Sequence, residues 1–467
     1  MKAKVSKTYL VFIAVLTAIA ATVALTSCQK GGESSSQRTT AAASAATQDE
    51  AAAATLPEGS GSAKLTESDI AVNETIENAE DGGHAIVADG ETLSYANVRV
   101  NKTGEADGDE ADFYGENAAV FATNGGTLTL KDMVVKTDGT HANAVFSYGE
   151  GTTVNIANAY IETSGNCSGG LMTTGGTMNA ENLTINTSGN SSAAIRSDRG
   201  GGTVNVTGGN YTTSGTGSPV IYSTADITVS DATMTSTASQ GVVVEGKNAV
   251  TLNNVNLTAD NNKKNSDKSS RYQAVMIYQS MSGDAAEGVS RFAMNGGTLT
   301  NQNGDVFFVN NTATEITLNN AQITNNGEGV FLRAAAAGWG SEGSNGGQVT
   351  LNASNQIING DMIVDSVSHL NLYLSNNASF TGAINSSGQD GEVYVEIEDG
   401  SIWTLTGDSY ITGMTCGANA INLNGHKLFI DGTSYTEGSA SFGDPIAVQS
   451  TGNGHGGGNP PAKPEND

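Results

Sequence analysis

The chain has 467 residues, of which 59 are Gly and only 6 are Pro, and 37% are hydrophobic. It carries 21 Lys and Arg against 48 Asp and Glu, which gives a formal net charge of -27. Nucleic acid is excluded as a partner, because so few cations cannot easily form the basic stripe that phosphate contacts need. A content of 15% charged and 6% aromatic residues also excludes a coiled coil and a membrane helix bundle.

The amino terminus has the layout of a secretory signal. Three lysines within the first seven residues precede an apolar run over residues 9–25, which ends in the motif LTSC at Leu25–Cys28. The small residues before Cys28 resemble a bacterial lipobox, in which the cysteine is lipidated and becomes the new amino terminus. Residues 1–28 are therefore interpreted as a lipoprotein signal peptide. The expected location is the cell membrane or outer membrane, extracytoplasmic and surface-exposed, with the lipid on Cys28 as the anchor. An uncleaved membrane helix with an incidental cysteine is the alternative.

Two segments have too few large apolar side chains to offset their ordering entropy by burial. Residues 29–62 are predicted to be a flexible tether, and residues 434–467 a disordered Gly/Pro-rich tail. Cys167 and Cys416 lie too far apart in the repeat described below for a disulfide. No two of the five histidines are spaced as metal ligands, and neither a metal nor a cofactor is expected.

One phrase recurs about every two dozen residues between the tether and the tail. Three of its copies are GTLTLKDMVVKTDG at Gly126, TTVNIANAYIETSG at Thr152 and GTMNAENLTINTSG at Gly176. The first apolar anchors of six consecutive copies, with spacings of 26, 24, 26, 23 and 23, are Leu128, Val154, Met178, Val204, Ile227 and Val250. The later anchors, and that of a degenerate first copy, are Phe292, Ile316, Val349, Leu370 and Leu93.

Each copy alternates apolar and polar residues at period 2, breaks at Asn, Asp or Gly, and then resumes before a third apolar stretch. Three short strands joined by tight turns make one coil of a parallel β-helix, and stacked coils bury a continuous apolar column. The sequence thus predicts an all-β protein with a single parallel β-helix of roughly 11–14 coils over residues 63–433. Outward Thr, Asn and Ser should form ladders between coils, and segments 65–91 and 403–430 should cap the open edges.

Several phrases resemble a known family. The lipobox, the GTVNV-type copies, SPVIYSTADITV at Ser218 and VMIYQSMSGDAAEG at Val275 are similar to surface lipoproteins of gut-type bacteria described as right-handed parallel β-helix repeat, or adhesin-like, proteins. The resemblance covers residues 66–433. It implies a right-handed helix at a cell surface but no catalytic residues, because the family has no agreed activity. The architecture also resembles, more distantly, pectate lyases and polygalacturonases, whose chemistry does not follow from the fold alone.

The third strand of each coil offers the best candidate site. One apolar residue per coil is predicted to point inward: Val120, Val145, Leu171, Ile195, Ile221, Val244, Ile277, Phe308, Leu332 and Val364. The next residue is then predicted to point outward: Phe121, Phe146, Met172, Arg196, Tyr222, Glu245, Tyr278, Val309, Arg333 and Asp365. Insertions at 105–112, 261–270, 280–289 and 335–346 wall this face, and loops around one face of a solenoid are a usual place for binding.

Exposed rings between charged groups suit the binding of a polysaccharide, because the C–H faces of sugars pack on aromatic rings. Guanidinium and carboxylate groups can form hydrogen bonds or ion pairs with sugar hydroxyls or uronates. The residues of this binding hypothesis are Phe121, Phe146, Arg196, Tyr222, Glu245, Tyr278, Arg333 and Asp365. The protein is therefore interpreted as a membrane-anchored binding or adhesion protein that presents this face to glycans or another surface partner. Alternatively, these side chains only stack on one another, or the insertions cover them.

A polysaccharide lyase or glycoside hydrolase acting on acidic polysaccharide at the same face is the alternative function. Arg196, Tyr222, Glu245 and Lys247 lie on consecutive coils and include candidate bases. The motifs of polygalacturonases and the clustered Asp ligands of pectate lyases are missing, however, so the catalytic residues stay unknown. The acidic stretch 105–112 leaves calcium binding open, since alternate carboxylates can hold this ion.

Overall fold

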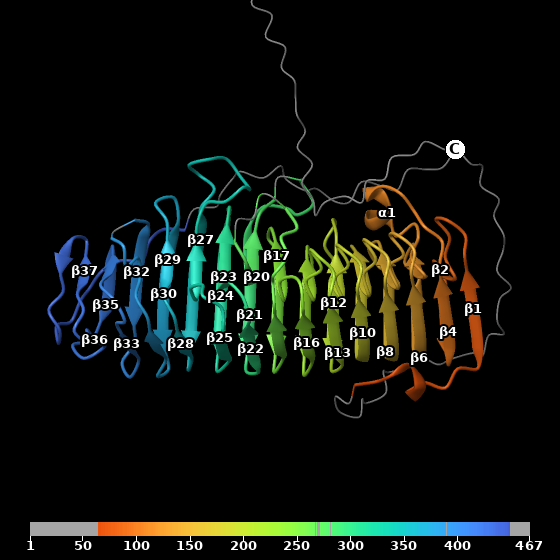
Figure 1. Ribbon diagram of the computed structural model, residues 1–467, viewed down its shortest axis with the longest axis horizontal. Coiled ribbons are helices and arrows are strands. Elements are labelled where there is room, and N and C mark those ends of the chain that lie inside the picture. The colour runs from red at the N-terminus through yellow and green to blue at the C-terminus, as the bar shows by residue number, and fades with distance from the viewer. Residues whose placement is uncertain (1–63, 267, 269–270, 281, 389, 449–467) are drawn as a thin grey trace, which may run out of the picture.

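The computed structural model describes residues 64–448, apart from 267, 269–270, 281 and 389. Residues 1–28, predicted to be a signal peptide ending at Cys28, and residues 29–62, predicted to be a tether, lie outside the described residues. Nearly all regular structure in the described part is β-strand, so the protein is all-β, as predicted. The strands stand side by side in one long row, from β1 (Glu74–Asn78) to β37 (Leu428–Ile430) (Figure 1). No helix within the described ranges combines the length and the hydropathy needed to cross a bilayer.

The largest sheet has 20 strands among the described residues. Besides β1 they are β3 (Thr92–Ala96), β4 (Val98–Lys102), β6 (Thr127–Thr137), β8 (Thr153–Thr163), β10 (Thr177–Thr187), β12 (Thr203–Thr207), β13 (Asn210–Thr213), β15 (Asp226–Ser230), β16 (Thr233–Ser236), β18 (Ala249–Asn253), β19 (Asn256–Ala259), β21 (Val289–Asn295), β22 (Thr298–Asn301), β24 (Thr312–Asn319), β25 (Gln322–Asn325), β27 (Gly347–Ser354), β30 (His369–Ser375), β32 (Glu392–Ile397) and β35 (Gly413–Cys416). This sheet contains the repeat anchors.

The second sheet has 11 strands in the described part and contains the predicted third strands. They are β2 (Ile86–Asp89), β5 (Val120–Thr123), β7 (Val145–Tyr148), β9 (Leu171–Thr174), β11 (Ile195–Ser197), β14 (Ile221–Ser223), β17 (Val242–Glu245), β20 (Gln273–Tyr278), β23 (Asp305–Asn310), β26 (Leu332–Ala334) and β29 (Met362–Val364). Two small sheets complete the C-terminal end, with strands β28 (Ile357–Asn359), β31 (Ser379–Thr381), β33 (Ile402–Thr404) and β36 (Ile421–Asn422), and β34 (Ser409–Ile411), β37 and β38 (Thr433–Ser434).

Successive strands pair in parallel, one repeat apart, in the register that the repeat predicts. Leu128 pairs with Val154, which also pairs with Met178. The same line of partners continues through Val204, Ile227, Val250, Phe292 and Ile316. Ile316 then pairs with Leu351, two residues beyond the expected Val349 and on the same side of β27. Within the described residues, the antiparallel pairing of named strands is that of β37 with β38.

A single apolar column fills the stack. Inward side chains such as Leu128 and Val145 are fully buried and belong to one contiguous cluster, which no single repeat could bury alone. On the outside, the Asn179 amide donates a hydrogen bond to Asn155 at 2.9 Å and receives one from Asn205 at 3.0 Å. These contacts confirm the ladders expected between repeats. The bends inside the long strands use left-handed backbone, as at Asn158 with φ 53°, which Asn tolerates.

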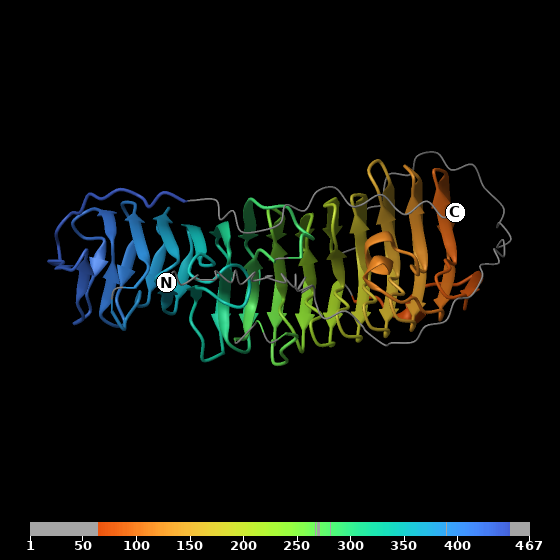
Figure 2. The ribbon, with the colours of Figure 1, turned by 90° about the horizontal axis from the view of Figure 1, so that it is seen from above.

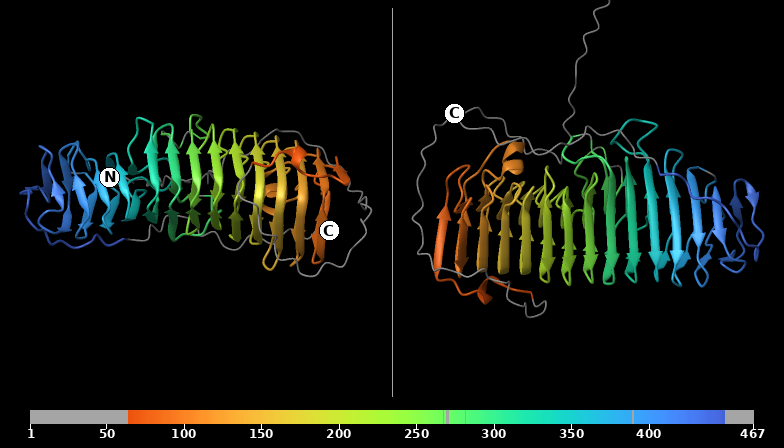
Figure 3. Two further views of the ribbon diagram at one scale, coloured as in Figure 1. Left: turned by 90° about the horizontal axis from the view of Figure 1, so that it is seen from below. Right: turned by 180° about the vertical axis from the view of Figure 1, so that it is seen from behind.

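The insertions and the described part of the tail lie on the outside of the stack. Helix α1 (Asp109–Tyr114) and the loops before β20 and after β26 rise from one edge of the row (Figures 1, 2 and 3). At the other end of the chain, residues 435–448 pack on the last strands instead of forming the start of a disordered tail. Ser441 forms an isolated antiparallel β-bridge with Cys416. The backbone of Ile446 forms two hydrogen bonds with the side chain of Asn371, at 2.8 and 2.9 Å. Residues 449–467 lie outside the described residues.

A short segment before β1 lies against the outer face of the first strands. The 3-10 helix η1 (Glu67–Asp69) precedes β1, and Glu67 forms ion pairs of 2.6 Å with both Arg99 and Lys136. These side chains are partly exposed, so each ion pair contributes little stability by itself. Their effect is to fix the segment across the strands that carry Arg99 and Lys136.

Candidate functional site

The outer face of the 11-stranded sheet is covered rather than exposed. Six of the predicted binding residues have exposed fractions between 0 and 6%: Phe121, Phe146, Arg196, Tyr222, Glu245 and Tyr278. Their aromatic side chains do not join the inner column and instead form two separate outer clusters. The expectation of a solvent-exposed ridge is therefore wrong, because α1 and the inserted loops form a second layer on this face.

The predicted side-chain directions are right except in β23. Nine of the ten residues predicted to point inward lie in the inner column. The exception is Phe308, which belongs to an outer cluster. Its neighbour Val309 was predicted to point outward but lies in the inner column. The reason is that residues 306–309 are all apolar, so alternation cannot fix the register of this strand.

Helix α1 covers the face over β5 and β7. Gly115, directly after α1, has φ 70°, and a Cβ atom there would lie 2.8 Å from the Phe121 ring and 3.0 Å from the Phe146 ring. Only glycine fits this left-handed turn against two rings. The guanidinium of Arg199 lies over the ring of Phe113 in α1, 4.0 Å from its centroid. The predicted binding residues Phe121 and Phe146 thus support α1.

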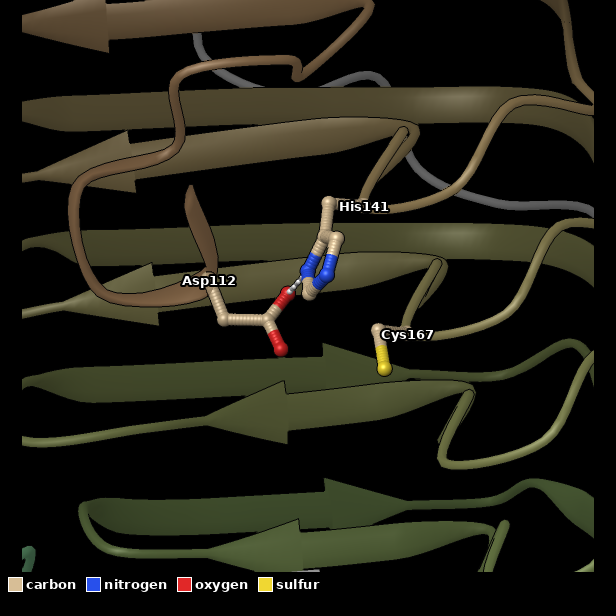
Figure 4. A group of neighbouring side chains, drawn as sticks. All are labelled: Asp112, His141 and Cys167. Atoms are coloured by element: carbon tan, nitrogen blue, oxygen red, sulfur yellow. Dashed lines mark ion pairs between the residues drawn. The ribbon is translucent and has the colours of Figure 1, made fainter. Parts of the chain in front are cut away.

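A buried polar cluster lies beside α1 and consists of Asp112, His141, Cys167, Arg196 and Asp198. Asp112 Oδ1 is 3.0 Å from His141 Nδ1, and Arg196 donates to Asp112 Oδ2 at 3.0 Å. The same Arg196 nitrogen also contacts the Asp198 carboxylate. Figure 4 shows the carboxylate of Asp112 turned toward the His141 ring, with Cys167 on the neighbouring turn. Ligand atoms of Asp112, His141 and Cys167 all lie within 4.8 Å of one another.

Burial and charge oppose each other within this polar cluster. Burial raises the pKa of Asp112, but Arg196 and His141 outweigh it and hold the pKa below the ordinary value. At Asp198 burial dominates and raises the pKa to about 7, although Arg196 opposes it. Burial lowers the pKa of Arg196, but the carboxylates of Asp112 and Asp198 raise it by more. The pKa therefore lies above its ordinary value, and the guanidinium stays charged. Asp112 is the last residue of the acidic stretch 105–112, and its carboxylate contacts His141 and Arg196.

The cluster was not predicted from the sequence, although a signal for two of its five residues exists. His141 and Cys167 follow the repeat anchors Leu128 and Val154 by the same number of residues, and those anchors pair directly. Aligning the copies would have placed the imidazole and the thiol in equivalent turns. Asp112 has no such signal, because it comes from an insertion that no other copy repeats.

A pocket lies over the strands β14, β17 and β20, between the loop from β19 to β20 and the loop from β26 to β27. Tyr222, Tyr278 and Trp339 give it an aromatic floor, and the rim carries the cations Lys263, Lys264 and Arg271. No Asp or Glu is among the described residues that line this pocket. Its volume is about 60 Å³. Two of the eight residues in the binding hypothesis, Tyr222 and Tyr278, therefore line an actual pocket.

The two loops hold each other and fix the position of Trp339. The backbone N–H of Gly338 donates to the carbonyl of Lys268 at 3.2 Å, which joins one loop to the other. The side-chain amide of Asn345 donates to the carbonyls of Ala337 at 2.7 Å and Trp339 at 2.8 Å. The sequence predicted that these insertions wall the face and left open that they cover its side chains, which is the arrangement that the structure has.

Glu245 lies beneath the pocket and connects the two floor tyrosines. The hydroxyls of Tyr222 and Tyr278 donate to the same Glu245 oxygen, Oε2, at 2.5 and 3.0 Å. Burial raises the pKa of Glu245 and, together with the Glu245 charge, raises the pKa of both tyrosines well above 10. The tyrosines therefore keep their protons near neutral pH and act as rigid hydrogen-bonded supports.

The remaining predicted residues serve the loops. Arg333 Nε donates to Asp305 Oδ2 at 2.6 Å. Asp365 accepts hydrogen bonds from the backbone of Ala336 at 2.7 Å and from the hydroxyl of Ser368 at 2.6 Å. The predicted residues thus divide among α1, the polar cluster, the pocket and the loop bases. Comparison of the chain with protein-family models, with curated proteins and with solved structures gave no match.

Proposed function

We propose that the chain forms a right-handed parallel β-helix of roughly 11–14 coils, with three strands per coil, attached to a cell surface by a lipid on Cys28. Long parallel sheets whose strands follow one another a repeat apart support the helix. The LTSC motif and the apolar run before it support the anchor. A stack of this kind suits a surface protein, because its lateral area grows with the number of coils.

The function that we propose is binding of an acidic polysaccharide at the pocket between the two loops. The observation that carries the proposal is the charge of the rim. Lys263, Lys264 and Arg271 surround the aromatic floor with no carboxylate among the described lining residues, in a chain of net charge -27. A local cationic site on an otherwise acidic protein attracts polyanions and orients them toward this site.

The size of the pocket limits what enters it. A volume of about 60 Å³ holds a few water-sized groups. A carboxylate or sulfate substituent with the edge of one sugar ring fits this space, while the rest of the polymer lies across the loops. Trp339 and Tyr278 then contact the C–H groups at this edge of the sugar, and the cations contact the anionic groups.

We propose binding and not catalysis because two of the candidate bases, Arg196 and Tyr222, are buried and already paired. Arg196 is buried and paired with two carboxylates. Tyr222 is buried, its pKa is raised by burial, and its proton is directed at Glu245. A lyase needs a base that can take a proton from a sugar carbon at neutral pH, and neither group is suited to that role.

Charge reversal at the rim tests the proposal. The Lys263→Glu/Lys264→Glu variant is compared with Lys131→Glu/Lys427→Glu, which changes the same charge at exposed lysines that do not line the pocket. We expect the rim variant to bind a polyuronate at least about tenfold more weakly, with the control within about twofold of the unchanged chain. Equal affinities of the two variants would contradict the proposed site.

A further inference from the structure

We propose that Asp112, His141 and Cys167 bind one divalent transition-metal ion of the zinc type. All three side chains are buried, and their ligand atoms lie within 4.8 Å of one another (Figure 4). Zinc is bound by thiolate, imidazole and carboxylate at about 2.0 to 2.3 Å, so a small contraction brings the three atoms onto one ion. This site is independent of glycan binding, since its residues do not line the pocket.

The backbone holds two of the ligands in equivalent turns. His141 lies between β6 and β7, and Cys167 lies between β8 and β9, one repeat later. Both have left-handed backbone, with φ 56° and 54°, and the next two repeats place Ser191 and Gly217 at the same position, with φ 53° and 64°. Adjacent parallel strands lie about 4.8 Å apart, so an imidazole and a thiol from equivalent turns can share one ion.

The third ligand is oriented by a residue outside the set. Arg196 holds Asp112 Oδ2 at 3.0 Å, which leaves Oδ1 directed toward His141. Outer hydrogen bonds of this kind fix the direction of a metal-bound carboxylate. The thiolate favours zinc or another soft ion over magnesium and calcium, which prefer oxygen ligands. Three protein ligands leave the fourth position of a tetrahedral ion for a water molecule or another small ligand.

Metal binding would also join α1 to the sheet. Asp112 belongs to α1, whereas His141 and Cys167 belong to the turns after β6 and β8. An ion that bonds to all three connects the insertion to two consecutive repeats. We therefore expect the ion to raise the melting temperature, because a ligand that binds only the folded state stabilises it.

The test is a titration of the purified full chain with Co²⁺ after treatment with a chelator. We expect one equivalent to bind, with a near-ultraviolet thiolate-to-cobalt band and visible bands of a tetrahedral ion. Cys167→Ser should abolish the thiolate band and weaken binding at least about tenfold. The matched control is Cys416→Ser, which removes the other buried cysteine and should leave the spectrum unchanged.

A second readout keeps the test decisive if Cys167→Ser does not fold. Asp112→Asn and His141→Gln should each weaken Co²⁺ binding and remove the rise in melting temperature that Zn²⁺ gives the unchanged chain. His369→Gln is the control for the histidine, because His369 pairs with Glu392 at 2.9 Å and lies in β30. A spectrum without a thiolate band, a band retained in Cys167→Ser, or a melting temperature insensitive to Zn²⁺ in the unchanged chain overturns the site.

Discussion

The indole ring of Trp339 packs edge-on against the phenol ring of Tyr278, with the ring centroids 5.1 Å apart. Tyr278 belongs to β20, and Trp339 belongs to the loop between β26 and β27. The two rings together form part of the floor of the pocket, since the loop supplies one ring and the sheet supplies the other. The pocket therefore depends on residues from the repeat and from an insertion.

Replacing Trp339 by alanine should weaken glycan binding without unfolding the stack. Loss of one ring from the floor is expected to reduce affinity by about 1 kcal/mol or more. The control is Trp403→Ala, in which a fully buried core indole is removed. That change should destabilise the fold by about 3 to 5 kcal/mol. Calorimetric titration and thermal unfolding measure the two effects, and equal affinity loss in both variants would argue against the floor.

Stability should fall as the pH rises through neutrality. Burial raises the pKa of Asp198 to about 7, above the ordinary value of a free carboxyl. The folded state therefore holds this proton more tightly than the unfolded state, and the associated stability is present at low pH and is lost as the pH passes about 7. The expected loss is on the order of 2 kcal/mol between about pH 5 and about pH 8.

The Asp198→Asn variant identifies the group responsible. It should flatten the stability profile between about pH 5 and about pH 8, because the titrating carboxyl is gone. Asp112 has a lowered pKa, caused by Arg196 and His141 against the effect of burial, and so contributes stability that is lost only in acid. Chemical denaturation in the presence of a chelator measures both profiles. An unchanged slope in the variant would show that other groups set the pH dependence.

Gly115→Ala should loosen α1. The added Cβ atom would lie 2.8 Å from Phe121 and 3.0 Å from Phe146, on a residue with φ 70°. Gly296→Ala is the control, because its φ is 65° and nothing lies within 4 Å of the added atom. The difference between the two variants measures the contact alone. We expect faster hydrogen exchange over residues 111–118 in Gly115→Ala only, and equal exchange in both would contradict this packing.

The tyrosine support under the pocket can be tested at Glu245. Glu245→Leu would leave the buried hydroxyls of Tyr222 and Tyr278 without their shared acceptor. A buried polar group without a partner costs about 1 to 3 kcal/mol, so this variant should be destabilised by at least that amount. Glu245→Gln keeps an acceptor oxygen and should be destabilised less. Denaturant unfolding measures both, and equal stability of the two would contradict a supporting role.

The repeat could be predicted from the sequence because its signal is local and recurs many times. The pairing of Leu128 with Val154 follows from the spacing of two similar phrases. The direction of Phe308 could not be predicted, since it lies in an apolar run without alternation. Trp339 and Asp112 could not be placed either, because each lies in an insertion that occurs once. Their positions depend on contacts with distant strands rather than on any periodic pattern.

The most direct test of glycan binding at the pocket is a calorimetric titration of the unchanged chain with a polyuronate and with the same polymer after esterification of its carboxylates. Both polymers present the same sugar faces to Trp339 and Tyr278, but only the first carries the charges that Lys263 and Lys264 would contact. If the cations of the pocket hold the polymer, the free acid should bind measurably and more weakly with added salt, and the ester should bind at least about tenfold more weakly. Equal binding of the two polymers, or no binding of the free acid at low salt, would contradict glycan binding at the pocket.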